Sequence, residues 1–176
     1  MSGVGLAQPI VSLSEAQAFV RIETGEEEAI VAGLIRTASA LCEAFLNQVV
    51  IERAFTADMP ARAEWTRLPL TPVRAITSVA GVDAAGTSTA LASSAFALDI
   101  DSSGDGWVRA MQSGPTRFRV TGTAGIGATP NDVPEPIRQG VLRLIAHLFT
   151  ARDGAGGDVP AAVTALWRPY RRLRLA

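Results

Sequence analysis

Residues 25–47, GEEEAIVAGLIRTASALCEAFLN, contain the longest helical pattern of the chain. Apolar side chains recur in it at steps of four, four, three and four, which is the spacing of one helical face. These side chains are Ile30, Leu34, Ala38, Leu41 and Phe45. Thr24 and Glu27 have the spacing of a capping box just before this pattern. We therefore expect a helix from about Gly25 to Asn47 that buries this stripe.

Shorter helical patterns lie on both sides of the long helix. Ser12 and Glu15 form a second capping box, which predicts a helix through about Arg21. Asp132 is expected to cap a C-terminal helix whose apolar face is Ile137, Val141, Leu144, Ile145, Leu148 and Phe149. A last helix is expected after Asp158 and to end at Pro169. Two amphipathic helices in one small protein bury their apolar faces together, so we expect the long helix to pack on this C-terminal helix.

The middle of the chain has the pattern of β-strands. Short β-branched and aromatic segments alternate there with Gly, Pro, Ser and Asp clusters, as in an antiparallel meander. The expected strands are Val49–Thr56, Trp65–Leu68, Ala75–Val82, Ala95–Ile100, Trp107–Met111 and Phe118–Thr123. The small, polar segment Gly81–Ser94 is expected to be an exposed loop or a hairpin tip.

These patterns predict an α+β protein with a mainly helical body and a central antiparallel β insertion. We expect one domain over residues 1–176, because this length fits a single core. Its parts are N-terminal helices at 12–48, a β-rich insertion at 49–124, C-terminal helices at 132–167 and a basic tail at 168–176.

Composition excludes several classes of protein. The formal charge is −1, which gives no overall attraction to nucleic acid or to an acidic membrane. All 16 basic residues are arginine. One cysteine, Cys42, and one histidine, His147, exclude an internal disulfide and argue against a Cys/His metal site. No apolar run approaches the roughly 20 residues that span a bilayer. We expect a soluble, intracellular protein without metal, cofactor or membrane contact.

Motifs that resemble active or ligand sites are each incomplete. The segment Asp99–Gly104 starts like a calcium loop, but Ala110 stands where the bidentate Glu belongs, so a hairpin turn is expected. Gly122–Gly127 is rich in glycine without a phosphate-binding spacing, and we expect a loop there. Cys42 and His147 have no partner at catalytic spacing. The sequence therefore predicts that the protein is not an enzyme.

Two charged segments are candidates for function. The acidic triplet Glu26, Glu27 and Glu28 opens the long helix, where the helix dipole favours negative charge; a solvated helix start is the alternative to a functional role. The C-terminal stretch combines arginines with aromatic residues, a composition typical of protein interfaces. Its candidate contact residues are Trp167, Arg168, Tyr170, Arg171, Arg172 and Arg174.

Three stretches together resemble the head–tail connector proteins of long-tailed bacteriophages and gene transfer agents. The first is LSEAQAFVR at 13–21, followed by the acidic residues at 25–28 and the long helix to Gln48. The second is LPLTPVRAITSV at 68–79. The third joins VPEPIRQ at 133–139, HLFTAR at 147–152, and residues 159–171. Their order and spacing cover about residues 13–172.

The resemblance implies a structural adaptor in the neck of a virion or phage-like particle, made in the bacterial cytoplasm. Such an adaptor forms a ring of about a dozen copies under the capsid portal and joins it to the next neck (stopper) protein. DNA passes through the ring without sequence-specific binding. We expect the C-terminal stretch to bind the portal protein and the acidic triplet to face the channel. The alternative function is that of a small regulatory or nucleic-acid-binding protein.

Overall fold

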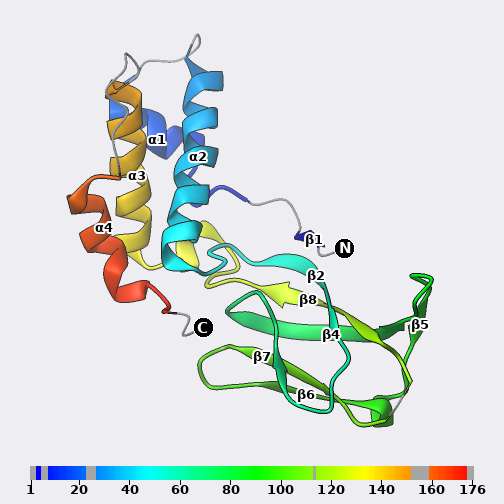
Figure 1. The fold of residues 1–176 in the computed structure, drawn as a ribbon. Helices are drawn as coiled ribbons and strands as arrows, with labels where there is room; N and C mark the ends of the chain where they lie inside the picture. Colours follow the sequence, from blue (N-terminus) through cyan, green and yellow to red (C-terminus); the bar gives the residue numbers. More distant parts are fainter. Residues whose placement is uncertain (1–2, 5–7, 23–26, 113, 152–158, 174–176) are drawn as a thin grey trace. The chain divides into compact units, whose positions relative to one another are not determined.

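The computed structural model describes residues 3–4, 8–22, 27–112, 114–151 and 159–173. Within them the chain forms two compact units. The β unit contains residues 52–126 together with 3–4, and the helical unit contains residues 8–51 and 127–173. The β unit is therefore inserted into the helical unit. The predicted α+β class, with helices on both sides of a central β segment, is confirmed (Figure 1).

The strands described in the β unit form two antiparallel sheets, and most of these strands are labelled in Figure 1. The first has the order β1-β2-β8-β4-β5. Its strands are β1 (Gly3–Val4), β2 (Arg53–Pro60), β8 (Arg117–Ala124), β4 (Val73–Val82) and β5 (Ser88–Ala90). The second has the order β3-β7-β6, with β3 (Thr66–Arg67), β7 (Gly106–Ala110) and β6 (Phe96–Ile100). A short 3₁₀ turn, Ser93–Ala95, precedes β6.

The strand order differs from the expected meander. β2 pairs with β8, in the register Arg53↔Ala124 through Pro60↔Arg117, and β8 pairs on its other side with β4. The last strand therefore lies in the centre of the larger sheet. Its burial alternates strictly, because every second residue from Phe118 to Ala124 faces the core. The residues on that face therefore belong to the core. Arg119 lies between two of these buried positions and is directly paired with Asp58 across β8 and β2, and the two side chains form an ion pair of 2.7 Å.

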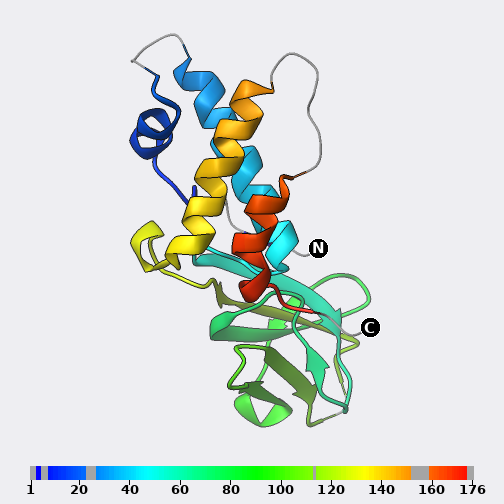
Figure 2. The ribbon, with the colours of Figure 1, turned by 90° about the vertical axis from the view of Figure 1, so that its left-hand side faces the viewer.

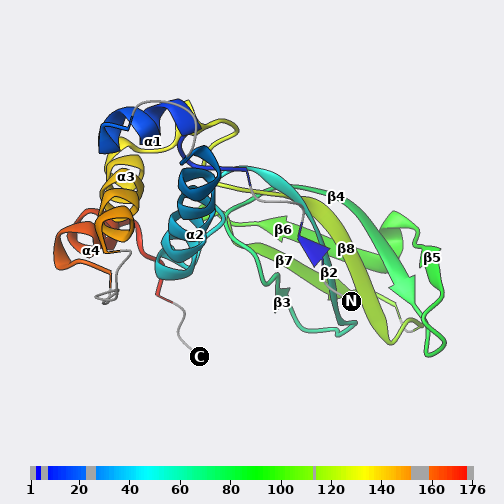
Figure 3. The same cartoon turned by 90° about the horizontal axis from the view of Figure 1, so that it is seen from above.

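The described residues of the helical unit form four α-helices, drawn from blue to red in Figure 2. They are α1 (Leu13–Val20), α2 (Glu28–Leu46), α3 (Glu135–Thr150) and α4 (Ala161–Trp167). Two 3₁₀ turns, Pro130–Asp132 and Arg168–Tyr170, precede α3 and follow α4. Helix α3 packs on each of the other three helices. In the view from above, α3 lies between α4 and α2 (Figure 3).

Helix starts agree with the sequence prediction at α1 and differ at α2 and α3. The capping box of Ser12 and Glu15 is formed as predicted. Helix α2 begins at Glu28 with Glu27 as its N-cap, and Thr24 lies outside the described residues. Asp132 does not cap α3; its carboxylate instead accepts hydrogen bonds from Thr129 and closes the preceding 3₁₀ turn. Pro134 stands at the N-cap of α3.

The buried face of α2 is rotated by one residue from the predicted stripe. Its buried residues are Val31, Ile35, Ala38, Ser39, Cys42 and Leu46. Of the predicted stripe only Ala38 is fully buried, while Ile30 is 43% and Leu41 is 38% exposed. The prediction for α3 is correct at Ile137, Val141, Leu144 and Ile145, whereas Leu148 and Phe149 are half-buried. Both stripes of α2 have helical spacing, so periodicity could not decide between them.

Candidate functional site

The described part of the C-terminal segment, residues 168–173, runs back across the end of α2. The backbone N–H of Arg172 donates to the carbonyl of Leu46 over 2.9 Å, and the side-chain amide of Gln48 donates to the carbonyl of Tyr170. The Leu46 carbonyl belongs to the last turn of α2, where no intrahelical donor is available. The segment therefore supplies a hydrogen bond that α2 needs, and it is attached to the helical unit along its backbone.

Trp167, predicted as a contact residue of the C-terminal stretch, is instead a core residue. Its side chain is fully buried, its indole N–H donates to the Ile137 carbonyl over 3.1 Å, and its ring lies 5.7 Å from that of Phe45. Gly140 makes this possible, because a Cβ there would come within 2.1 Å of the indole nitrogen. A glycine inside the strong helical pattern of α3 was the sequence signal for this close approach.

Beyond Trp167, the side chains of the segment differ in their exposure. Arg168 and Arg171 are exposed, Tyr170 and Arg172 are half-buried, and Leu173 is 78% exposed. The Arg171 guanidinium lies 5.2 Å from the centre of the Phe45 ring, in cation–π geometry. Arg174 lies outside the described residues. The structure thus gathers three arginines and a tyrosine on a short segment that is fixed by its backbone and by Trp167.

The acidic candidates lie at the other end of α2. Glu27 is its N-cap and Glu28 its first residue, while Glu26 lies outside the described residues. Glu28 is exposed. Both carboxylates are near the positive end of the helix dipole, which stabilises negative charge there. Whether they also face a channel stays a prediction.

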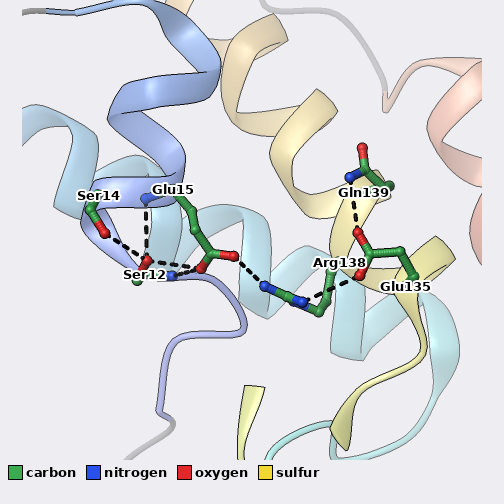
Figure 4. A network of polar contacts seen from close by, with 6 residues as sticks. All are labelled: Ser12, Ser14, Glu15, Glu135, Arg138 and Gln139. Carbon is green, nitrogen blue, oxygen red and sulfur yellow. Dashed lines mark hydrogen bonds and ion pairs between the residues drawn. The ribbon is translucent and has the colours of Figure 1, made fainter. Parts of the chain in front are cut away.

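A polar network that sequence analysis did not foresee joins α1 to α3 (Figure 4). Glu15 accepts hydrogen bonds of 2.8 Å from the backbone N–H and the hydroxyl of Ser12. Its other carboxylate oxygen accepts a hydrogen bond from Arg138 of α3. Arg138 also donates to Glu135 over 3.2 Å, and Glu135 accepts from Gln139 over 3.0 Å. Glu15, which belongs to the capping box of α1, is therefore also the ion-pair partner of Arg138 in α3.

This network predicts a pH dependence of stability. The hydrogen bonds from Ser12, together with the charge of Arg138, hold the pKa of Glu15 below its usual value. A carboxyl group with a lowered pKa stabilises the fold above its unfolded pKa, and the stabilisation is lost as pH falls. We expect Glu15→Gln to lower the free energy of unfolding at pH 7 and to flatten its decline below about pH 4.5. Urea unfolding at several pH values, followed by helical circular dichroism, measures both effects.

Glu64→Gln is the matched control, because Glu64 is an exposed glutamate of the β unit. Its curve of helical stability against pH should match that of the unchanged protein. If the free energy of unfolding fell with decreasing pH as steeply in Glu15→Gln as in the unchanged protein, the role assigned to Glu15 would be contradicted.

The segment that resembles a calcium loop is a hairpin turn, as predicted. One carboxylate oxygen of Asp101 accepts from the backbone N–H groups of Ser103 and Asp105, and the other accepts from the indole of Trp107. Gly104 has φ of +80°, which the turn requires. Asp101 is thus used by the turn itself. Gly122 of the glycine-rich segment lies within β8 rather than in a loop.

The candidate nucleophile and base do not form a reactive centre. Cys42 is buried in the face of α2 that packs on the other helices, and this burial raises the pKa of its thiol far above neutral pH. His147 is half-buried, and its Nε2 has no hydrogen-bond partner among the described residues. Within those residues no group of three or more His, Cys, Asp or Glu side chains could hold a metal ion.

Chains similar to this one occur in solved structures of gene transfer agent (GTA) particles. One is from the neck of an empty GTA particle computed with C6 symmetry, with a TM-score of 0.80 and 29% identity. Another is from the neck of a native GTA particle computed with C12 symmetry, with a TM-score of 0.79 and 26% identity. A third is from the virion of a native GTA particle, with a TM-score of 0.78 and 26% identity. Each match covers 100% of this chain and 97% of the other.

The chain therefore resembles the head–tail connectors of particle necks. The resemblance found in the sequence is confirmed, and it extends over the helical unit and the β unit alike. The connector is a structural component of a particle neck and not an enzyme. No protein-family model matches the chain, and no curated protein matches it.

Proposed function

We propose that the connector assembles as a ring of about a dozen copies beneath the capsid portal and joins the portal to the next neck (stopper) protein. The observation that carries this proposal is the full-length similarity to chains of GTA necks computed with C6 and C12 symmetry. A closed ring needs contacts between two different faces of each copy. The DNA passes through the centre of the ring without sequence-specific binding.

The C-terminal segment is the proposed portal contact. Arg168 and Arg171 are exposed on a backbone that is fixed by Arg172 and Tyr170. Guanidinium groups held in this way bind carboxylates of a partner through charge-assisted hydrogen bonds. Trp167 acts in this proposal from within the core, because it fixes the start of the segment.

The acidic start of α2 is the proposed channel surface. Negative side chains repel the phosphates of DNA, so they would prevent the DNA from adhering as it passes. Glu27 and Glu28 are the described residues that would serve this purpose, and Glu26 precedes them in the sequence.

The portal contact is tested with the double variant Arg168→Glu and Arg171→Glu. The backbone hydrogen bonds of the segment do not involve these side chains, so we expect a folded protein. Its binding to purified portal should fall at least tenfold, and heads assembled with it should lack tails and lose DNA. Sedimentation of the connector with portal, and electron microscopy of the heads, measure these effects.

The control variant carries the same charge change in the β unit, at the exposed residues Arg62 and Arg117. It should bind portal as the unchanged connector does. Normal portal binding by the Arg168/Arg171 variant would place the portal contact on another surface. Absence of the connector from the neck, when particles are imaged, would contradict the proposed function as a whole.

A further inference from the structure

Strand β6 is an open edge of the smaller sheet (Figure 1). Within the described residues it pairs with β7 alone, whereas β7 pairs with β6 on one side and β3 on the other. Proteins usually protect such edges with short strands, lysine or proline, because the free backbone groups pair readily with another chain. Strand β6 has five residues, Phe-Ala-Leu-Asp-Ile, with one charged side chain and no proline. It is therefore open to pairing with a further strand.

The hydrogen bonds at the two ends of the β6–β7 ladder show which backbone groups of β6 are free. The N–H of Met111 donates to the carbonyl of Ala95 over 2.9 Å, and the N–H of Asp101 donates to the carbonyl of Asp105 over 3.0 Å. Hydrogen-bonded and non-hydrogen-bonded pairs alternate along an antiparallel ladder. The β6 residues whose N–H and C=O groups point away from β7 are therefore Phe96, Leu98 and Ile100.

The side chains of this edge specify the kind of strand that fits it. Leu98 and Ile100 lie directly opposite Val108 and Gly106, which are both buried, yet they are 38% and 39% exposed themselves. Asp99 points to the other face of the sheet, is exposed, and has no ion-pair partner among the described residues. Residues directly opposite each other share a face, so the fitting strand has the pattern apolar, basic, apolar.

The end of the chain has this pattern. Residues 173–175 are Leu-Arg-Leu. The backbone just before them is fixed, because the N–H of Arg172 donates to the Leu46 carbonyl, and it is extended at Arg171. Leu173, the last described residue, is 78% exposed. The segment therefore leaves the helical unit with an apolar side chain that this unit does not cover.

We infer that residues 173–175 of one copy add a strand to β6 of the neighbouring copy in the ring. The inference rests on the proposed function, since it assumes that the ring forms. In an antiparallel arrangement, Arg174 lies opposite Asp99, and their charges are complementary. The leucines on either side lie opposite Ile100 and Leu98 and extend the apolar face of the sheet.

A neighbouring copy suits this edge for two reasons. A ring closes through contacts between two unlike surfaces of each copy, and a tail with an edge strand is such a pair. The other free edge strand with described residues on both sides, β5, has the sequence Ser-Thr-Ala and offers neither apolar pairs nor a charge. A strand of three residues suffices, because the assembled ring keeps the tail close to the edge and raises its effective concentration.

The first test joins the two strands covalently. Asp99→Cys and Arg174→Cys are combined in one chain on a Cys42→Ala background, and assembled particles are oxidised. Opposite residues of a non-hydrogen-bonded pair have Cα atoms about 4.5 Å apart, which a disulfide can bridge. We expect a ladder of oligomers on a non-reducing gel from the double-cysteine chain, and at most dimers from either single-cysteine chain.

The other outcomes of this test are distinguishable. A disulfide within single chains, in place of the ladder, would show that the tail pairs with its own β6 and would overturn the inference. Absence of any disulfide from necks that contain the ring would also overturn it and leave the proposed function intact. If particle necks contain no copy of the connector, the inference and the proposed function fail together.

The second test removes a free donor of the edge with Leu98→Pro. The N–H of Leu98 points away from β7, so proline at this position keeps the hydrogen bonds between β6 and β7. We expect a protein that is folded by circular dichroism and whose incorporation into particle necks falls at least tenfold. Leu98→Val is the control, because it keeps the N–H and an apolar side chain, and it should be incorporated within twofold of the unchanged connector.

Deletion of residues 173–176 tests the same contact without any change in β6. It keeps Arg168 and Arg171, so sedimentation with portal should remain unchanged while incorporation into necks falls at least tenfold. Normal incorporation of the shortened chain, or of folded Leu98→Pro, would overturn the inference.

Discussion

Trp167→Ala is expected to lower the free energy of unfolding of the helical unit by about 3–5 kcal/mol. The substitution removes a fully buried indole, its ring contact with Phe45 and its hydrogen bond to the Ile137 carbonyl. The space left behind is bounded by Gly140, which has no side chain to fill it. Such a loss is a large part of the roughly 5–15 kcal/mol that stabilises a typical protein. Thermal or urea unfolding followed by helical circular dichroism measures it.

Two substitutions serve as controls for Trp167→Ala. Trp167→Phe keeps an aromatic ring but removes the indole N–H, so its effect should be smaller. Trp65→Ala makes the same chemical change in the β unit, where the side chain is 42% exposed, and should leave helical unfolding unchanged. A loss below about 1 kcal/mol for Trp167→Ala would show that the indole is not a core residue.

Gly122→Ala is expected to destabilise the β unit by about 3 kcal/mol, the upper end of the usual cost of overpacking. A Cβ at this position would come within 2.2 Å of the backbone oxygen of Ala75 and 3.1 Å of the Phe55 ring. The neighbouring strand β4 shifts register between Val73 and Ala75 and again between Ile76 and Ser78. The backbone oxygen belongs to a paired strand and cannot move aside alone. Urea unfolding in a Trp167→Phe background, where Trp65 and Trp107 are the tryptophans that fluoresce, reports on this unit.

Gly33→Ala adds the same methyl group at a site with room for it. The nearest atom to a Cβ there is the end of the Arg36 side chain at 3.9 Å. Because Gly33 lies inside α2, alanine should stabilise the helical unit by up to about 1 kcal/mol. If the β unit of Gly122→Ala were as stable as that of the unchanged protein, the close approach of β4 and β8 would be contradicted.

Local patterns allowed most elements to be predicted from the sequence. The capping box of Ser12 and Glu15 depends on residues three apart and formed as expected. The strands after Arg53 also lie within a few residues of their predicted bounds, because alternation and turn residues are local signals. The pairing of β2 with β8 was not predictable in this way. It joins segments about 60 residues apart, and no local pattern records it.

The candidate site was likewise predictable from the sequence only in part. The concentration of arginine at 168–172 was visible in the sequence, whereas the burial of Trp167 depends on Gly140 in another helix. The two apolar stripes of α2 illustrate the same limit. Ile30 and Val31 begin stripes of equal spacing, and only packing against α3 makes the second one the core. The connector family itself was recognised from three short stretches in their order.

The points at which the chain leaves and re-enters the helical unit are neighbours. Ile51 and Gly127 form a bridge, and the Gly127 N–H donates to the Val50 carbonyl over 3.1 Å. The 75 residues between them, 52–126, begin and end at one spot on the helical framework. Exchange of this segment during evolution would therefore leave the path of the helices unchanged. Such an exchange changes the inserted module and keeps the helices as a constant frame.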